Sequence, residues 1–146
     1  MGAAVDGRSE RQPKVLVIAT ALCSYPGADA VGQMHLDYPP NCYVIKCLDP
    51  VLFPEDFYLD CFTKGIDGII VASCGTDCPY EGAYEKTAAR IDRVYKRMRE
   101  RGLDPKRLRL TAICSVCTKA FLREVEGLNQ TLEELGPVGA ADVADE

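Results

Sequence analysis

Short runs of β-branched and other apolar residues alternate along this chain with longer stretches in which apolar residues recur at helical spacing. Runs of this length are typical of buried strands, and recurrence every three or four residues is typical of amphipathic helices. The predicted strands are Val15–Thr20, Tyr43–Cys47, Gly68–Ser73 and Leu108–Ile113. The predicted helices are residues 28–36, 54–64, 81–101 and 118–135. The order of elements is therefore βαβαβαβα.

The predicted strands are apolar on both faces, as in the runs VLVIA and IIVA. Such strands are typical of a parallel sheet that helices cover on each side, joined by right-handed crossovers. We therefore predict an α/β fold with a four-stranded, parallel, doubly wound sheet of the flavodoxin-like type, in the strand order 2-1-3-4. In such a sheet, ligands bind at the carboxyl ends of the strands, in the crevice between strands 1 and 3.

Glycine and proline punctuate this pattern where helices are expected to begin and end. The expected C-caps are Gly65, Gly102 and Gly136, and the expected first-turn proline is Pro54. The chain has 146 residues, which is about the size of one domain. We expect a single domain over residues 1–146, with a folded core at about 14–136 and loose ends on either side.

Composition and charge argue against nucleic-acid binding, a membrane span and export. Apolar residues make up 47% of the chain and the net charge is −5, so the protein is globular and has no overall charge for nucleic-acid binding. The apolar stretch Val15–Leu22 is too short to span a membrane, and acidic residues precede it, which argues against an export signal. We therefore expect a cytoplasmic protein with no nucleic-acid partner and no membrane span. In that reducing compartment, cysteines more often bind metal or carry out redox chemistry than form disulfides.

The cysteines gather at one edge of the predicted sheet. Tips of neighbouring strands lie about 4.8 Å apart, so thiols from adjacent strand tips can converge on one group. Chance burial of a small apolar side chain would explain one or two such positions, and Cys42 and Cys61 are interpreted in that way as packing residues. The other six cysteines fall at or just beyond the carboxyl ends of strands: Cys23, Cys47, Cys74, Cys78, Cys114 and Cys117.

Two of the cysteine pairs have chelating spacing. Cys74 and Cys78 are separated by three residues, and Cys114 and Cys117 by two. Four thiolates suit either zinc or an iron–sulfur cluster, and the second pair also suits a dithiol–disulfide couple. A zinc site built from the two pairs leaves Cys23 and Cys47 unexplained, whereas a cluster with ligands from three adjacent strand tips uses them. An electron carrier, a structural zinc or interaction module, and a dithiol redox protein are therefore the alternatives.

Several segments resemble one protein family, the iron–sulfur (delta) subunit family of methyl-viologen-reducing hydrogenase. The likeness covers roughly residues 14–136. Each segment alone is a weak signal, but their order along the chain is fairly specific. The segments are Cys23-Ser-Tyr-Pro-Gly-Ala-Asp29, Tyr38-Pro-Pro-Asn41, Gly65-Ile-Asp-Gly68, the loop from Cys74 to Cys78 with Tyr80 and Tyr84, and Arg107-Leu-Arg109.

The resemblance implies a small [2Fe-2S] protein that is not itself catalytic. It implies cluster ligands at Cys23, Cys47, Cys74 and Cys78. It also implies electron relay between a hydrogenase, formate dehydrogenase or reductase module, including class II benzoyl-CoA reductases, and a heterodisulfide-reductase-like flavoprotein.

This sequence departs from the family pattern at several points. Thr20 stands where the family has a cysteine, and the loop that follows the third strand is one residue shorter. Cys114 and Cys117 lie in a stretch that commonly lacks cysteine. These two are therefore reserve ligands, and a [4Fe-4S] cluster or zinc is the alternative occupant.

The helix predicted over residues 81–101 is strongly basic on one side. Ten of the 17 basic residues lie between Lys86 and Arg109. The predicted buried stripe is Tyr84, Ala88, Ile91, Tyr95 and Met98, which leaves Arg90, Arg93, Arg97 and Arg101 largely outside. Such a face is either simply solvated or docks onto an acidic partner subunit.

Overall fold

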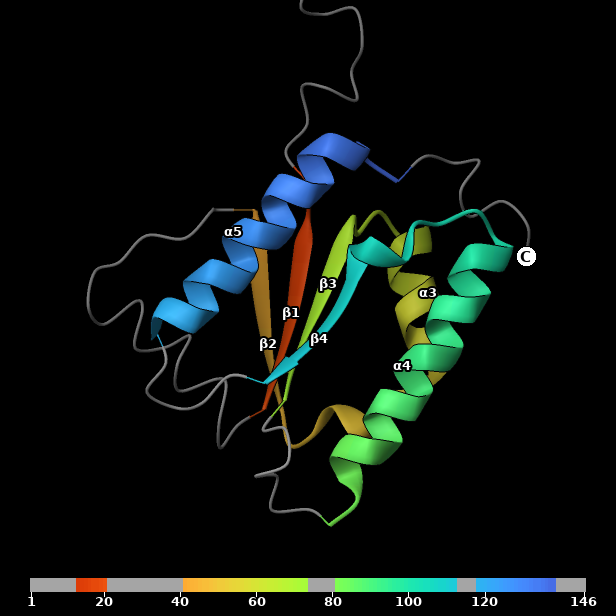
Figure 1. Cartoon of the computed structure of the whole chain (residues 1–146), viewed down its shortest axis with the longest axis vertical. Coiled ribbons are helices and arrows are strands. Elements are labelled where there is room, and N and C mark those ends of the chain that lie inside the picture. Colours follow the sequence, from red (N-terminus) through yellow and green to blue (C-terminus); the bar gives the residue numbers. More distant parts are fainter. Residues whose placement is uncertain (1–12, 21–40, 74–80, 113–117, 139–146) are drawn as a thin grey trace, which may run out of the picture.

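Four parallel strands form one sheet in the order β2-β1-β3-β4 (Figure 1). The computed structural model describes residues 13–20, 41–73, 81–112 and 118–138. The strands are β1 (Val15–Thr20), β2 (Cys42–Cys47), β3 (Gly68–Ser73) and β4 (Leu108–Ala112). The predicted order and the parallel direction are confirmed. β2 begins one residue earlier than predicted, and Ile113 lies outside the described residues.

The helices of the described residues follow the predicted pattern closely. They are α3 (Glu55–Thr63), α4 (Ala83–Glu100) and α5 (Thr118–Leu135), with 3-10 helices η2 (Pro50–Leu52) and η4 (Pro105–Arg107). α5 has the predicted bounds, whereas α3 and α4 are each two or three residues shorter than predicted. The helix predicted over 28–36 lies outside the described residues. None of the helices in these ranges is long and apolar enough to cross a membrane.

Glycine ends the helices as predicted. All three expected C-cap glycines have a positive φ, which a residue without a Cβ adopts at little cost. At the end of α5, the Gly136 amide donates to the carbonyl of Leu132 at 2.8 Å and closes the last turn. Pro54 is the N-cap of α3, one position before the first turn in which it was expected.

One face of the sheet packs against α5. Alternate residues of β1 and β3 point to this face because side chains of a strand alternate between its two sides. Gly68 lies where a Cβ would come within 2.6 Å of Leu132 Cδ1, so glycine allows the helix to approach the sheet. The buried residues on this side include Val15, Val17, Ala19, Ile70, Ala72, Phe121, Val125, Leu128 and Leu132.

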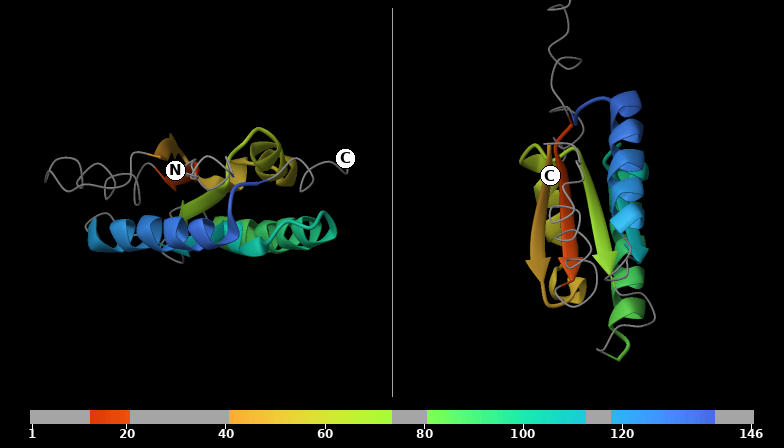
Figure 2. Two further views of the ribbon diagram at one scale, coloured as in Figure 1. Left: turned by 90° about the horizontal axis from the view of Figure 1, so that it is seen from above. Right: turned by 90° about the vertical axis from the view of Figure 1, so that its left-hand side faces the viewer.

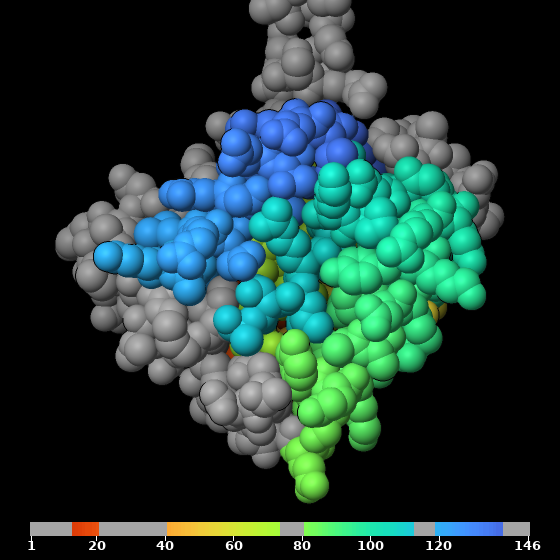
Figure 3. Space-filling view, viewed as in Figure 1, coloured from red at the N-terminus to blue at the C-terminus, as the bar shows by residue number. Residues whose placement is uncertain are grey.

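The opposite face packs against α3 and α4. In Figure 1, α5 lies across β2 and β1 on the left, and α3 and α4 lie on the right, beyond β3. In the space-filling view of Figure 3, β4 stays visible between α5 and α4, in agreement with the partial burial of its residues 109–111. Helices on both faces, the doubly wound arrangement, are therefore confirmed. The buried residues on this side include Leu16, Ile18, Tyr58, Leu59, Phe62, Ile69, Val71, Ile91, Val94 and Met98.

The buried stripe of α4 differs from the predicted one. Only Ile91 and Met98 of the predicted stripe are fully buried. Tyr95 is half-buried, and its hydroxyl donates to the carbonyl of Leu108 at 2.9 Å. A tyrosine at the margin of a core can keep its hydroxyl on a hydrogen-bond partner. Thr87 and Val94, which were not part of the predicted stripe, are buried on α4 instead. The buried residues of α4 are Ala83, Thr87, Ile91, Val94 and Met98.

Of the four arginines that were predicted to lie largely outside, three belong to α4 and Arg101 is its C-cap, and only Arg93 is exposed. It pairs with Glu55 at 2.8 Å, and Arg97 pairs with Asp56 at 2.7 Å, both across the contact with α3. The acidic residues in the first turn of α3 therefore pair with these two arginines within the chain itself. The prediction is wrong for the three half-buried arginines: Arg90, Arg97 and Arg101.

Candidate functional site

The candidate site lies at the carboxyl edge of the sheet, where β1, β2 and β3 end. The arrowheads of the strands point the same way in Figure 2 (right). Thr20, the last residue of β1, pairs with Cys47, the last residue of β2. Ala19 pairs with Ala72 of β3, so Ser73 stands level with Thr20 and Cys47. The three strands therefore end side by side at one level.

Cys47 is the one predicted ligand that the structure describes, and it lies at that edge as predicted. It is a free, half-buried thiol. Within the described ranges, no group of three or more His, Cys, Asp or Glu side chains is placed to hold a metal ion. The other predicted ligands and the two reserve ligands lie outside the described residues: Cys23, Cys74, Cys78, Cys114 and Cys117.

Chain connectivity limits how far two of those cysteines can lie from Cys47. Cys74 directly follows Ser73 in the chain, and Ser73 is two strand spacings, about 10 Å, from Cys47. Cys23 follows Thr20 by three residues, which span at most about 10 Å of extended chain. The fold is therefore compatible with a common group for these thiols.

Cys47 sits between an apolar layer and a carboxylate. Its side chain packs against the core on the α3 and α4 side together with Phe53 and Phe57. Burial, and secondly the nearby charge of Asp49, raise the pKa of the Cys47 thiol to about 11. The buried Asp49 carboxylate accepts from the amide of Val51 at 2.9 Å and so caps η2. The free side chain is thus a protonated thiol, and metal ligation is what would displace its proton.

The two cysteines interpreted as packing residues behave as expected. Cys42 begins β2 at the opposite edge, is buried among the residues that face α5, and has its thiol pKa raised to about 12 by burial. Cys61 lies on α3 and packs against the core on the other side of the sheet. Cys42 begins β2, five residues before Cys47, and Cys61 lies on α3, so neither belongs to the row of strand ends at the candidate site.

Tyr58 of α3 is a feature of the site that sequence analysis missed. Its side chain is fully buried, and its hydroxyl has no hydrogen-bond partner among the residues that the structure describes. Burial raises the pKa of Tyr58 above its usual range, the charge of Arg90 lowers it, and the charges of Cys47, Cys61 and Asp49 raise it further. Helical periodicity could place Tyr58 inside, but no pattern in the chain shows which polar group its hydroxyl would meet.

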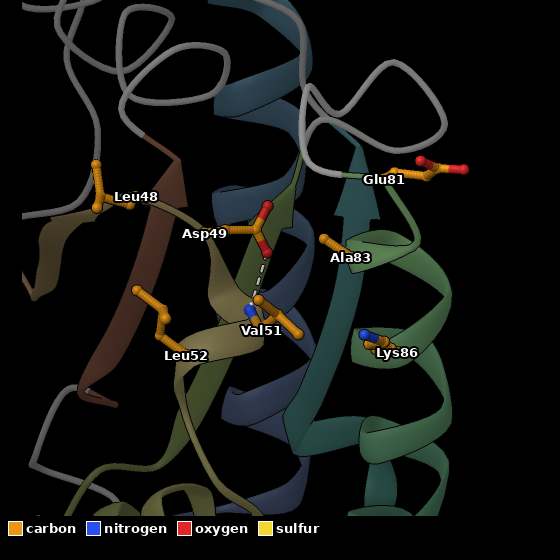
Figure 4. Close-up of a pocket in the computed structure, with 7 residues that line it drawn as sticks. All are labelled: Leu48, Asp49, Val51, Leu52, Glu81, Ala83 and Lys86. Atoms are coloured by element: carbon orange, nitrogen blue, oxygen red, sulfur yellow. Dashed lines mark hydrogen bonds between the residues drawn. The ribbon is translucent and has the colours of Figure 1, made fainter.

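A hollow of about 290 Å³ adjoins the site (Figure 4). Leu48 and Leu52 line it on one side and are largely exposed. Ala83 and Lys86 of α4 line the other side. Figure 4 shows Asp49 between the two sides, with its carboxylate on the Val51 amide. The segment after Cys47 therefore reaches α4 across the carboxyl edge of the sheet.

Arg90 holds that segment in place, and its removal is expected to destabilise the protein. Its guanidinium donates to the carbonyls of Phe53, at 2.7 Å, and Val51. Arg90→Ala removes these charge-assisted hydrogen bonds, so we expect a loss of about 2 kcal/mol in the free energy of unfolding. Arg93→Ala is the matched control, because its ion pair is exposed and is expected to contribute less than about 1 kcal/mol. Urea denaturation measures both, and equal losses would contradict this role of Arg90.

Comparison with known proteins finds relatives that match most of this chain. Residues 15–136 match the family described as methyl-viologen-reducing hydrogenase, delta subunit. The chain is 30% identical over 129 residues to the iron-sulfur subunit of the F420-non-reducing hydrogenase of Archaeoglobus profundus, covering 88% of this chain and 94% of that protein. It is 32% identical over 138 residues to one subunit of the ferredoxin:CoB-CoM heterodisulfide reductase of Methanosarcina mazei.

These relatives differ in length. The alignment to the Methanosarcina protein covers 94% of this chain but only 17% of that much longer one, whereas the Archaeoglobus protein is covered almost completely. The family match includes every strand and helix that the structure describes. The chain belongs to the methyl-viologen-reducing hydrogenase delta subunit family.

Proposed function

We propose that this chain is an electron-transfer subunit that holds one iron–sulfur cluster and catalyses no reaction of its own. The observation that carries the proposal is the position of Cys47. It ends β2 level with the ends of β1 and β3, and the segments that contain Cys23 and Cys74 continue directly from those two strands. The family, which includes a protein described as an iron-sulfur subunit, supports the same conclusion.

The proposed ligands are Cys23, Cys47, Cys74 and Cys78, and the proposed cluster is [2Fe-2S]. Four thiolates are the usual ligand set of such a cluster, which accepts and donates one electron at a time. The residues fit such a cluster, because Cys47, the proposed ligand that the structure describes, is a cysteine at the carboxyl end of β2. Its side chain packs against the apolar core on one side. Cys114 and Cys117 follow β4, the next strand along, and remain reserve ligands.

The chain's own residues supply a rigid and partly dry setting for this group. β1 and β3 are completely buried, so the strand ends that lead to the ligands are fixed by the core. Cys47, Phe53 and Phe57 pack against the same core cluster, and the two phenylalanine rings lie with their centroids 4.5 Å apart. Burial and nearby hydrogen-bond donors are what set the reduction potential of a cluster.

The proposed partners are a heterodisulfide-reductase-like flavoprotein and a hydrogenase, formate dehydrogenase or reductase module in the cytoplasm. Relatives of this chain occur in two settings: as a separate iron-sulfur protein of a hydrogenase, and as about a sixth of a longer heterodisulfide reductase polypeptide. A domain that occurs both with a hydrogenase and within a heterodisulfide reductase is suited to pass electrons between two such enzymes.

Electron relay is tested with the purified chain and the flavoprotein from the same organism. The cluster-loaded chain, reduced with dithionite and freed of excess reductant, is mixed anaerobically with the oxidised flavoprotein. We expect the flavin absorption to bleach within the mixing experiment, and the Cys47→Ser protein to leave it unchanged. Bleaching no faster than the background without the chain would contradict the relay.

Two other functions predict different results. A structural zinc or interaction module would purify colourless, with zinc and without iron or sulfide. A dithiol redox protein that uses Cys114 and Cys117 would lose electron transfer on Cys117→Ser. We expect Cys117→Ser to keep at least half of the transfer rate, and a complete loss with unchanged iron content would favour the dithiol mechanism.

A further inference from the structure

We propose that the hydroxyl of Tyr58 donates a hydrogen bond to the Cys47 sulfur when that sulfur is a cluster thiolate, and thereby raises the reduction potential of the cluster. This inference rests on the proposed function and deepens it. It assigns to Tyr58, a residue of the helix core, a tuning role toward the redox site.

The geometry carries the hydroxyl toward the carboxyl edge of the sheet. Tyr58 is the fourth residue of α3, which follows β2 through η2 and so begins at that edge. Long side chains on a helix lean toward its N-terminus, here toward the end of β2. The Phe57 ring lies edge-on to the Tyr58 ring at 5.5 Å, and Tyr58 packs in the same cluster as Cys47.

The hydroxyl of Tyr58 is an unused donor. The residue is 0% exposed, and within the described ranges its hydroxyl has no hydrogen-bond partner. Buried hydroxyl groups in proteins nearly always have a partner, and an exception requires an explanation. A group that binds at this place and brings an acceptor would remove the penalty of leaving the donor unpaired.

Among the surrounding groups, the Cys47 sulfur is the acceptor that changes when a cluster is bound. Electrostatic interactions link Tyr58 to Cys47 on β2, Asp49 before η2, Cys61 on α3 and Arg90 on α4. Arg90 can only donate, and it is held by the η2 segment. Asp49 is a carboxylate that caps η2 through the Val51 amide, and binding of a cluster does not change it as an acceptor.

Neither cysteine is a strong acceptor while it is a thiol. A neutral thiol accepts hydrogen bonds weakly, whereas a thiolate accepts a charge-assisted one. Cys61 lies on the same helix, is half-buried, and is not a proposed ligand. Cys47 is the proposed ligand and becomes a thiolate on coordination. The donor, which has no partner in the described part of the chain, therefore gains one when the cluster binds.

The expected consequence is a change in reduction potential. A hydrogen bond to a ligand sulfur stabilises the reduced cluster more than the oxidised one, because reduction adds negative charge to the site. Tyr58→Phe removes the donor and keeps the ring in the core. We expect Tyr58→Phe to bind iron and sulfide as the wild type does, with a more negative potential.

The matched control is Tyr95→Phe on α4. Tyr95 also packs on this side of the sheet, but its hydroxyl already donates to the Leu108 carbonyl at 2.9 Å. Redox titration followed by electron paramagnetic resonance measures the potential of the wild type and both variants. Tyr95→Phe is expected to match the wild type, and a Tyr58→Phe potential equal to the wild-type value would overturn the inference.

A second replacement covers the case in which Tyr58→Phe loses cluster. Incorporation of 3-fluorotyrosine at position 58 keeps the ring and makes the hydroxyl a stronger donor. The inference predicts a more positive potential, and a packing role predicts no change, which would overturn it. A wild-type chain without iron and sulfide would overturn the proposed function itself, so the two failures are distinguishable.

Discussion

Replacing Cys47 by serine is expected to yield a folded protein that has lost its cluster. Cys47 is the proposed ligand that the structure describes, at the level where β1, β2 and β3 end, and a serine hydroxyl is a much weaker ligand of iron than a thiolate. After anaerobic purification, we expect bound iron to fall to about a tenth of the wild-type content or less, with the visible absorption falling in parallel. Cys74→Ala is expected to give the same result.

Cys42→Ser and Cys61→Ser are the matched controls for this prediction. Cys42 lies at the other end of β2, five residues or about 16 Å along the strand from Cys47. Cys61 belongs to α3 and not to a strand end. Both variants are expected to retain iron and colour, although the buried Cys42 site should lose some stability. Full iron content in Cys47→Ser would remove Cys47 from the ligand set.

Asp67→Ala is expected to produce a large loss of stability at the opposite edge of the sheet. Asp67 is fully buried, and its carboxylate accepts from the backbone amides of Lys14 and Val138 at 2.8 Å each. It thereby ties the starts of β1 and β3 to the segment after α5. Alanine leaves both amides without this acceptor, so we expect a loss of about 3 kcal/mol and a fall of about 10 °C in melting temperature.

Thermal and urea unfolding measure this effect, with Asp60→Ala as the control. Asp60 is an exposed residue of α3, and its replacement is expected to change stability by less than about 0.5 kcal/mol. Because Asp67 lies at the amino edge, the folded Asp67→Ala protein should still bind the cluster. A stability loss below about 1 kcal/mol would show that the two amides find other partners.

Local patterns predicted most of the fold because they reflect local physics. β1 and β3 are runs of apolar residues buried on both faces, which only a covered parallel strand allows. α5 has the predicted bounds, because its apolar periodicity is clear and Gly136 ends it. Right-handed crossovers then leave few possible strand orders, and the observed one is the simplest.

Contacts between helices were not predictable in the same way. The arginines of α4 look like a solvated face until α3 is placed beside them, with Glu55 and Asp56 in its first turn. Tyr95 fits an apolar stripe by spacing, but the carbonyl of Leu108 holds its hydroxyl at the margin of the core. Such partners come from other elements, and periodicity within one helix carries no information about them.

The sequence predicted where the candidate site lies in the fold, but not the side-chain contacts around it. The topology brings the strand ends together, and the structure confirms the predicted position of Cys47 at the carboxyl edge of the sheet. The remaining proposed ligands belong to segments outside the described residues, so their roles stay predictions. The unpartnered hydroxyl of Tyr58 depends on side-chain packing between α3 and the sheet and could be found only in the structure.

Metal and sulfide analysis of the anaerobically purified chain, combined with electron paramagnetic resonance, tests the central claim most directly. The proposed [2Fe-2S] cluster predicts a brown protein with about two iron and two sulfide per chain and a paramagnetic signal on one-electron reduction. A [4Fe-4S] cluster would raise both contents to about four and correct only the cluster type. A colourless protein that contains zinc, or no metal, would contradict the claim that these cysteines hold an iron–sulfur cluster.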